Sequence, residues 1–248
     1  MTIQDAKRHV PRRRLRAAAP QVLTGARVAL GAAAAVAALE GPSHTAAALI
    51  TLGAATDLLD GPLARRLNVA SAFGALFDTF SDYLCFVVAP WTLTRALTAA
   101  GGDVSHEALV GLPLLTGAIR YARNSLLIIA AGGGEVRELP GLPTVFFAFV
   151  PVAAVFLDAR ALVGDAALPA ILTFLVVSFS LLMVAPAQYP KLTRARWAPA
   201  AVLALLVVMP FFGTRVLAAV MVVAGLLYVV VAHLFARGPA RLTREESG

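Results

Sequence analysis

Residues 166–190 read AALPAILTFLVVSFSLLMVAPAQYP, a run of apolar side chains that contains no Asp, Glu, Lys or Arg. A transmembrane helix needs about 20 mostly apolar residues, so this run is long enough to cross a bilayer. The rest of the chain agrees, because 59% of its 248 residues are hydrophobic and only 14% are charged, which is unusual for a soluble domain. The sequence therefore predicts an integral membrane protein.

Charged residues, glycine and proline divide the apolar sequence into segments of helical length. We expect an all-α, polytopic fold of about eight transmembrane helices in one membrane domain over 20–236. A basic juxtamembrane segment (1–19) should precede it, and a short tail (237–248) should follow it. The expected helices lie near 20–40, 43–67, 73–100, 107–132, 143–160, 166–188, 197–212 and 215–236.

The positions of Lys and Arg predict the orientation, since short cytoplasmic loops carry an excess of positive charge. With the N-terminus inside, fifteen basic residues fall on that side and three fall on the other, namely Arg95, Arg160 and Arg215. Both termini are therefore expected in the cytoplasm. The net charge of +7 does not indicate nucleic-acid binding, because the basic residues lie between apolar segments rather than on one soluble face.

Three arginines fall inside the expected helices: Arg27, Arg120 and Arg123. An ionisable side chain at membrane depth is a candidate functional residue, because it is costly there unless paired or hydrated. Arg27 is near a helix start, where its side chain can extend to the interface. That explanation is weaker for Arg120 and Arg123. The only cysteine, Cys85, lies in an apolar stretch and is expected to face lipid or to pack between helices.

Four aspartates fall within 26 residues, between the second and third expected helices. Asp57 and Asp60 are three residues apart and Asp78 and Asp82 four apart, so each pair lies on one helix face. Four converging carboxylates would repel one another and would be costly to bury. Mg²⁺ and Mn²⁺ prefer such oxygen ligands, and two ions can clamp a diphosphate. The pattern predicts a divalent metal site, with two ions expected.

Small residues lie between the aspartates. Gly61, Ala64 and Gly74 leave room for a nucleotide to approach the backbone, although small residues also allow close helix packing. Arg65 can neutralise phosphate charge, or it can simply be one of the cytoplasmic basic residues.

The spacing D-x2-D-G-x2-A-R-x8-G-x3-D-x3-D is satisfied at all eight defined positions and resembles the signature of the CDP-alcohol phosphatidyltransferase family. The resemblance implies a membrane enzyme with a six-helix catalytic core, here with two further helices, and a pocket open to the cytoplasm. It also implies a homodimer. The reaction it implies is transfer of a phosphatidyl group from CDP-diacylglycerol to an alcohol, with release of CMP. The implied metal ligands are Asp57, Asp60, Asp78 and Asp82, with Asp82 also the general base, and the implied CDP-binding residues are Gly61, Ala64, Arg65 and Gly74.

Later stretches are similar to the phosphatidylserine synthase branch of that family. Arg120-Tyr-Ala-Arg123-Asn124 is similar to its R-x-A-R-F-N, and residues 140–144, PGLPT, are similar to its G-L-P-T. Met183-Val184 with residues 189–191, YPK, resembles its M-V-S-N-x-x-Y-P region. Arg27, in contrast, stands where that branch often has asparagine. The resemblance favours L-serine as the acceptor.

A serine pocket needs a cation for the carboxylate of serine. Arg120 and Arg123, with Asn124, are candidates for binding the acceptor or, alternatively, the lipid phosphate. An acceptor with its own phosphate, such as glycerol 3-phosphate or inositol phosphate, would also need two or more basic residues and is the alternative. A transporter is a remote alternative, because intramembrane charges also mark ion pathways. The expected location is a bacterial or archaeal cell membrane, with the active site facing the cytoplasm.

Overall fold

The computed structural model describes residues 3–67, 71–98, 104–130 and 140–186, with side chains except those of residues 3–17, 19 and 58–66. All regular elements in these ranges are helices, which confirms the all-α prediction. The elements are α1 (Ile3–Glu40), α2 (Ser43–Leu67), α3 (Ala72–Tyr83), the π-helix η1 (Leu84–Val88), α4 (Ala89–Thr98), α5 (Val104–Ala130), α6 (Thr144–Phe156), α7 (Ala159–Val163) and α8 (Ala167–Val184).

The helix boundaries agree with the predictions in part. α2 has the predicted bounds, whereas α1 begins at Ile3, so the basic N-terminal segment and the first predicted helix are continuous. The helix predicted over 143–160 is wrong at its end. α6 stops at Phe156 because Asp158 adopts a φ of 53°, a left-handed conformation that interrupts a helix. The helices predicted over 197–212 and 215–236, and the tail, lie outside the described residues.

Within the described ranges, three helical stretches are long and apolar enough to cross a membrane: Pro20–Glu40, Ala72–Thr98 and Ala167–Val184, with mean hydropathies of 1.8, 1.4 and 2.4. The second comprises α3, η1 and α4 and is 27 residues long. α6 is also apolar but shorter. Length and composition therefore support a membrane protein, as the sequence predicts.

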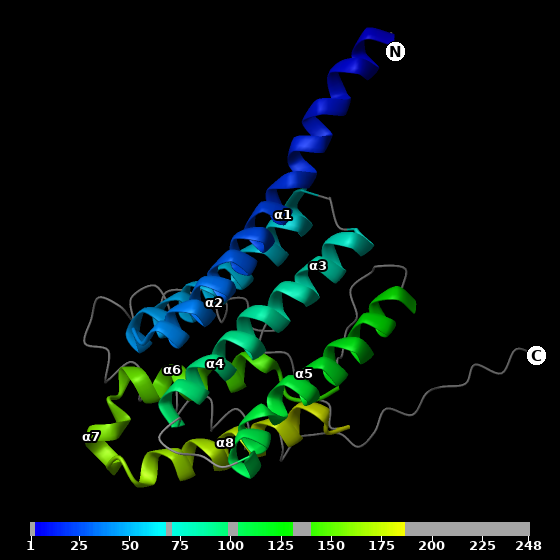
Figure 1. The fold of residues 1–248 in the computed structure, drawn as a ribbon. Coiled ribbons are helices and arrows are strands. Elements are labelled where there is room, and N and C mark those ends of the chain that lie inside the picture. Colours follow the sequence, from blue (N-terminus) through cyan, green and yellow to red (C-terminus); the bar gives the residue numbers. More distant parts are fainter. Residues whose placement is uncertain (1–2, 68–70, 99–103, 131–139, 187–248) are drawn as a thin grey trace, which may run out of the picture.

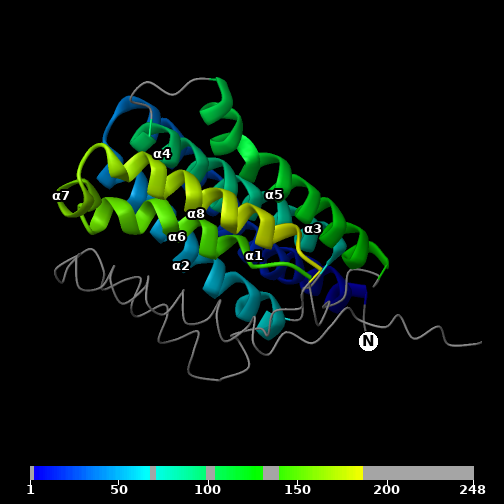
Figure 2. The same ribbon diagram turned by 90° about the horizontal axis from the view of Figure 1, so that it is seen from below.

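The helices form a bundle in which α1 and α2 make a hairpin (Figure 1). Its turn contains Gly41 at a φ of 110°, a conformation that side chains disfavour. The helices α3, η1 and α4 pack against α1, and α5 contacts both α3 and α8. Seen from below, α6 and α8 lie side by side (Figure 2). This arrangement places the C-terminal half of α2 and the C-terminal half of α3 beside the middle of α1.

The interface between α1 and α2 is formed by small side chains. Ala34 and Ala38 of α1 and Ala46 and Ala47 of α2 are essentially inaccessible to solvent. Small residues at a helix interface allow the backbones to approach closely, which is the usual packing of membrane helices. A second apolar cluster joins α6 to α8 and is formed by Leu142, Phe147, Val176, Phe179 and Met183.

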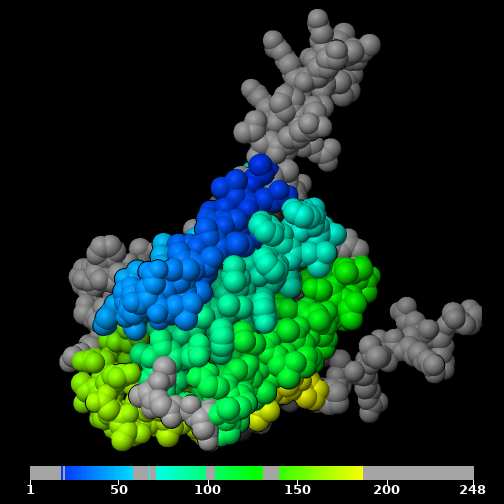
Figure 3. All heavy atoms as spheres, in the orientation of Figure 1, coloured from blue at the N-terminus to red at the C-terminus, as the bar shows by residue number. Residues whose placement is uncertain are grey.

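The outer surface also carries large apolar side chains. On the face shown in Figure 3, α1, α3 and α5 form neighbouring bands. Leu115 and Leu126 of α5 are more than half exposed, as are Phe174 and Leu181 of α8. Such exposure suits helices that contact lipid tails, which are as apolar as these side chains.

Candidate metal and substrate site

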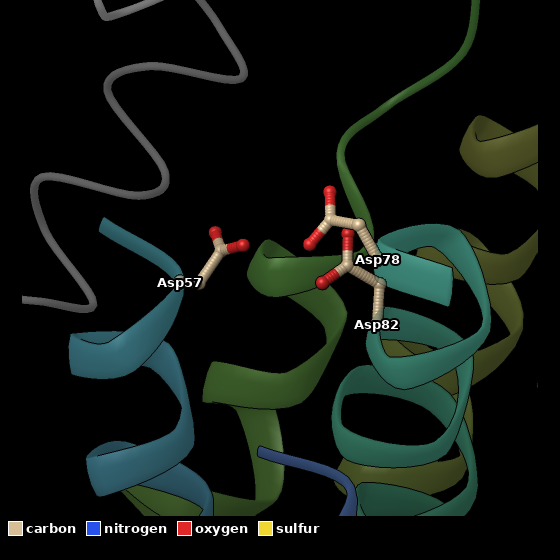
Figure 4. A group of neighbouring side chains, drawn as sticks. All are labelled: Asp57, Asp78 and Asp82. Atoms are coloured by element: carbon tan, nitrogen blue, oxygen red, sulfur yellow. The ribbon is translucent and has the colours of Figure 1, made fainter. Parts of the chain in front are cut away.

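The structure brings together three of the four predicted aspartates. Asp57 projects from α2 toward Asp78 and Asp82, which project from α3 (Figure 4). One carboxylate oxygen from each residue lies within 4.8 Å of the others. The side chains are 35%, 42% and 24% exposed, in chain order, so the group is open to solvent. We call these three residues the aspartate cluster.

The aspartate cluster suits a hard divalent cation. An ion that binds oxygen at about 2.1 Å requires its ligand oxygens to lie no more than about 4.2 Å apart, so small side-chain rotations would bring the three oxygens to this spacing. A donor set of carboxylates alone matches Mg²⁺ or Mn²⁺ rather than a softer metal. Partial exposure leaves room for water or phosphate oxygens as further ligands. The residues present therefore fit a metal site.

Other predicted site residues lie nearby on the backbone. α2 continues past Asp57 through Asp60, Gly61, Ala64 and Arg65, but the side chains of these residues are outside the described part of the chain. Gly74 is in the first turn of α3, and its N–H donates a hydrogen bond of 3.0 Å to the Ser71 hydroxyl.

Arg27 of α1 lies in the aspartate cluster. Its side chain is fully buried, and it donates hydrogen bonds from Nη1 to Asp57 and Asp82 and from Nη2 to Asp78. Arg27 is therefore paired inside the bundle, which favours a functional role over simple extension of its side chain to the membrane interface. A buried guanidinium needs paired anions, and its planar fork can reach several carboxylates at once.

One feature of the sequence indicates that Arg27 has a functional role. Arg27 is the only charged residue between Pro20 and Leu39, and such a residue in an apolar helix is a functional candidate by default. The direction in which it points could not be read from its position near a helix start. The ion pairs join residues that are 30 to 55 positions apart in the chain.

A layer of small residues supports the cluster one helical turn away. A Cβ atom on Gly53 would lie 2.3 Å from Cys85 Sγ, and a Cβ atom on Gly31 would lie 3.0 Å from Cys85 Cα. Cys85 is fully buried, so it packs between helices and does not face lipid. At this level α1 packs against the backbone of η1 and α2 packs against the Cys85 side chain, so the two glycines allow the helices that carry Arg27 and the aspartates to approach closely.

The helix that carries Asp78 and Asp82 changes its winding directly after them. η1 begins at Leu84 as a π-helix and returns to α-helix at Ala89. Single π-turns inside α-helices are uncommon, and those that occur are often found at functional sites. This one places Cys85 against the two glycines while the aspartates remain on the face toward α2.

A second polar group lies on α5. Arg120 and Asn124 are 6% and 3% exposed, and Arg123 donates a hydrogen bond of 2.8 Å to the Pro140 carbonyl oxygen. Arg120 Nε, Arg123 Nε and Asn124 Oδ1 are buried without a hydrogen-bond partner in the described part of the chain. Arg120 is also close enough to Asp82 to be attracted by its charge. We call these three residues the α5 polar group.

Three separate stretches of sequence meet at the α5 polar group. Gly141 adopts a φ of 88°, and a Cβ atom there would lie 2.0 Å from the Met183 carbonyl oxygen and 3.2 Å from Arg123 Nη2. The N–H of Leu142 donates to the Leu182 carbonyl oxygen at 3.0 Å. The stretches 120–124, 140–144 and 183–184 are those that resemble the phosphatidylserine synthase branch. Residues 189–191 lie outside the described residues.

Tyr121 of α5 links the α5 polar group to α6 and to α3. Its hydroxyl lies 2.6 Å from the Thr144 hydroxyl, and its ring packs edge-on against Tyr83, next to Asp82. Sequence reasoning did not identify Tyr121 or Thr144 as site residues. Both are close to the predicted motifs, but their contact joins two helices and has no local sequence signal.

The chain belongs to the CDP-alcohol phosphatidyltransferase family, because the family model matches residues 17–157, more than half of its length. It is therefore a transferase. It is similar to the CDP-diacylglycerol–serine O-phosphatidyltransferase of Helicobacter pylori strain J99, with 27% identity over 189 residues, which cover 75% of this chain and 78% of the relative. It is 33% identical to the archaetidylserine synthase of Methanothermobacter thermautotrophicus over 158 residues, 62% of this chain and 61% of that one.

A Methanocaldococcus jannaschii protein named CDP-diacylglycerol–serine O-phosphatidyltransferase is also 33% identical, over 146 residues. The match covers 58% of this chain and 62% of the relative. Two of these relatives are named as serine O-phosphatidyltransferases and the third as an archaetidylserine synthase, and they come from bacteria and archaea. The matched family region contains Arg27, all four predicted aspartates and the α5 polar group.

Proposed function

We propose that this enzyme transfers the phosphatidyl group of CDP-diacylglycerol to the hydroxyl group of L-serine, giving phosphatidylserine and CMP. The family match supports the reaction class, and the names of the relatives support the acceptor. The observation that carries the proposal to this chain is the meeting of residues 120–124, 140–144 and 183–184, at a helix whose Tyr121 packs against Tyr83, the residue after Asp82. Their buried, unpaired polar atoms need a ligand that offers both a donor and an acceptor.

In this proposal, Asp57, Asp60, Asp78 and Asp82 hold one or two Mg²⁺ or Mn²⁺ ions. A bound divalent ion would supply positive charge to the phosphates of the CDP-lipid. Asp82 is the general base, the role that the family resemblance implies for the last aspartate of the signature. It takes the proton from the acceptor hydroxyl as that oxygen attacks the lipid-side phosphorus and CMP departs.

The α5 polar group holds the acceptor. The free Nε–H groups of Arg120 and Arg123 suit the carboxylate of serine, and Asn124 Oδ1 can accept a hydrogen bond from its ammonium group. A ligand bound in this way would direct its hydroxyl toward Asp82. The same donors could hold the lipid phosphate, which is the second role considered for these residues.

The remaining features are proposed on the sequence and the family. Gly61, Ala64, Arg65 and Gly74 form the CDP site, and the membrane domain extends over 20–236 between a basic N-terminal segment and a short tail. Both termini and the active site face the cytoplasm, the bundle has about eight helices, and the enzyme is a homodimer. Fifteen of the 21 basic residues on one side support this orientation.

The direct test is CMP release by purified protein with CDP-diacylglycerol and Mg²⁺ or Mn²⁺, with serine, glycerol 3-phosphate or inositol phosphate as the acceptor. We expect release with serine and its loss with EDTA. Release with a phosphorylated polyol instead would support the same reaction with a different acceptor. The two arginines of the α5 polar group could also bind the phosphate of such an acceptor. No release with any of the three acceptors from folded protein would contradict the proposal.

A further inference from the structure

Arg27 occupies the space that a cation needs in the aspartate cluster. Its guanidinium bridges Asp57, Asp78 and Asp82, the same three residues whose oxygens are close enough to hold a metal ion. The positive charge is fully buried although the carboxylates are partly exposed. A divalent ion bound by the same three oxygens would lie close to the guanidinium and repel it.

We propose that Arg27 is a built-in competitor of the metal: it holds the aspartate cluster together in the metal-free enzyme, and metal binding displaces its Nη groups. This inference rests on the metal site of the proposed function. It assigns to Arg27 a role in setting metal affinity and in keeping the aspartates positioned before the metal binds.

The surroundings of Arg27 allow such a displacement. Each carboxylate has a second oxygen, so the guanidinium can stay paired with one aspartate while an ion takes the bridging positions. The aliphatic part of the side chain passes Gly53, where even a Cβ atom would be 3.9 Å from Arg27 Cγ. In this arrangement the guanidinium would move from a position that bridges three aspartates to an ion pair with one of them.

Competition also explains why an arginine is tolerated here. Three close carboxylates without a cation would repel one another and shift apart or take up protons. Arg27 supplies a charge that is always present. Its cost is a weaker apparent affinity for metal, because each cation disfavours the other. Coupling between two ligands of a protein is typically about 5- to 150-fold, which sets the scale of the expected effect.

The experiment compares Mn²⁺ binding by wild type, Arg27→Gln, Arg27→Lys and Arg95→Gln in detergent, followed by the loss of the free Mn²⁺ signal in electron paramagnetic resonance. Arg95 is a matched control, because it is a half-exposed arginine that pairs with Glu107. We expect Arg27→Gln to bind Mn²⁺ about tenfold more tightly than wild type. Arg27→Lys should lie between them, since an ammonium group has no planar fork, and Arg95→Gln should match wild type.

Thermal unfolding gives a second measurement. Without metal, Arg27→Gln should unfold at a lower temperature than wild type, and Mn²⁺ should raise its unfolding temperature by more than it raises that of wild type. If Arg27→Gln cannot be purified, the same two comparisons with Arg27→Lys decide the matter. Unchanged or weaker Mn²⁺ binding by the folded Arg27 variants would overturn the competition. Absence of Mn²⁺ binding by wild type would contradict the metal site itself, and with it the metal part of the proposed function.

Discussion

The aspartate cluster and the α5 polar group differ in how their polar atoms are satisfied. In the cluster, three carboxylates already have a partner within the chain, because Arg27 bridges them. In the α5 polar group, two guanidinium Nε atoms and an amide oxygen are buried without a partner in the described part of the chain. Buried polar atoms rarely stay unpaired, so the α5 polar group is expected to bind a ligand that pairs with these atoms.

This difference separates two kinds of role. A group that is satisfied without a ligand can form during folding and wait for its metal. A group that is incomplete without a ligand gains most when the ligand binds, which suits the recognition of a particular acceptor. Substitutions in the first region should therefore affect the chemical step and metal binding, and those in the second should affect acceptor affinity.

The largest expected effect is that of Asp82→Asn. It keeps the shape of the side chain but removes the base and one anionic partner of Arg27, so kcat should fall by at least about 100-fold. CMP release measures it, with folding checked by size-exclusion chromatography. Asp165→Asn, an exposed carboxylate outside the site, is the control and should leave kcat unchanged. A fully active Asp82→Asn enzyme would remove the general-base role.

Arg120→Gln should separate acceptor affinity from chemistry. A charged hydrogen bond contributes about 1.5–3 kcal/mol, so its loss should raise the KM for serine by about 10- to 100-fold. The KM for CDP-diacylglycerol should change much less. If the KM for the lipid rises instead, Arg120 binds the lipid phosphate and the contrast between the two regions must be redrawn.

Gly141→Ala tests whether the contact between residues 140–144 and α8 shapes the acceptor pocket. The new Cβ atom would meet the Met183 carbonyl oxygen at 2.0 Å, so the backbone must shift at a cost of about 1–3 kcal/mol. Gly164→Ala is a matched control, because Gly164 has a φ of 84° but open space around it. Gly141→Ala should lower the thermal unfolding temperature and raise the KM for serine more than Gly164→Ala does. Equal effects would show that only the backbone conformation matters.

Gly53→Ala should have the smallest effect of the four, through the layer that supports the aspartate cluster. Overpacking against Cys85 Sγ is expected to cost about 1–3 kcal/mol of stability, with kcat reduced as the helices move apart. Adding Cys85→Ala should restore both properties, because the nearest remaining Cys85 atom, Cβ, would lie 3.9 Å from the new methyl group. Gly25→Ala, with nothing within 4 Å, should not destabilise the protein. A double variant no better than Gly53→Ala would show that the contact with Cys85 is not the cause.

The class of fold and the chemical character of the site can both be read from the amino-acid sequence. Long apolar runs permit little except membrane helices, since the backbone must satisfy its own hydrogen bonds in lipid. The spacing of Asp78 and Asp82 places both on one helix face, because i and i+4 residues are neighbours on a helix. Such local relations can be read directly from positions along the chain.

Which distant residues meet depends on the tertiary fold. It turned Arg27 toward the aspartates, brought Gly141 against Met183, and set Cys85 between two glycines. Each of these contacts depends on how far a helix is rotated about its axis and where it crosses its neighbours. Those quantities follow from packing of small side chains across whole interfaces, and no short stretch of sequence specifies them.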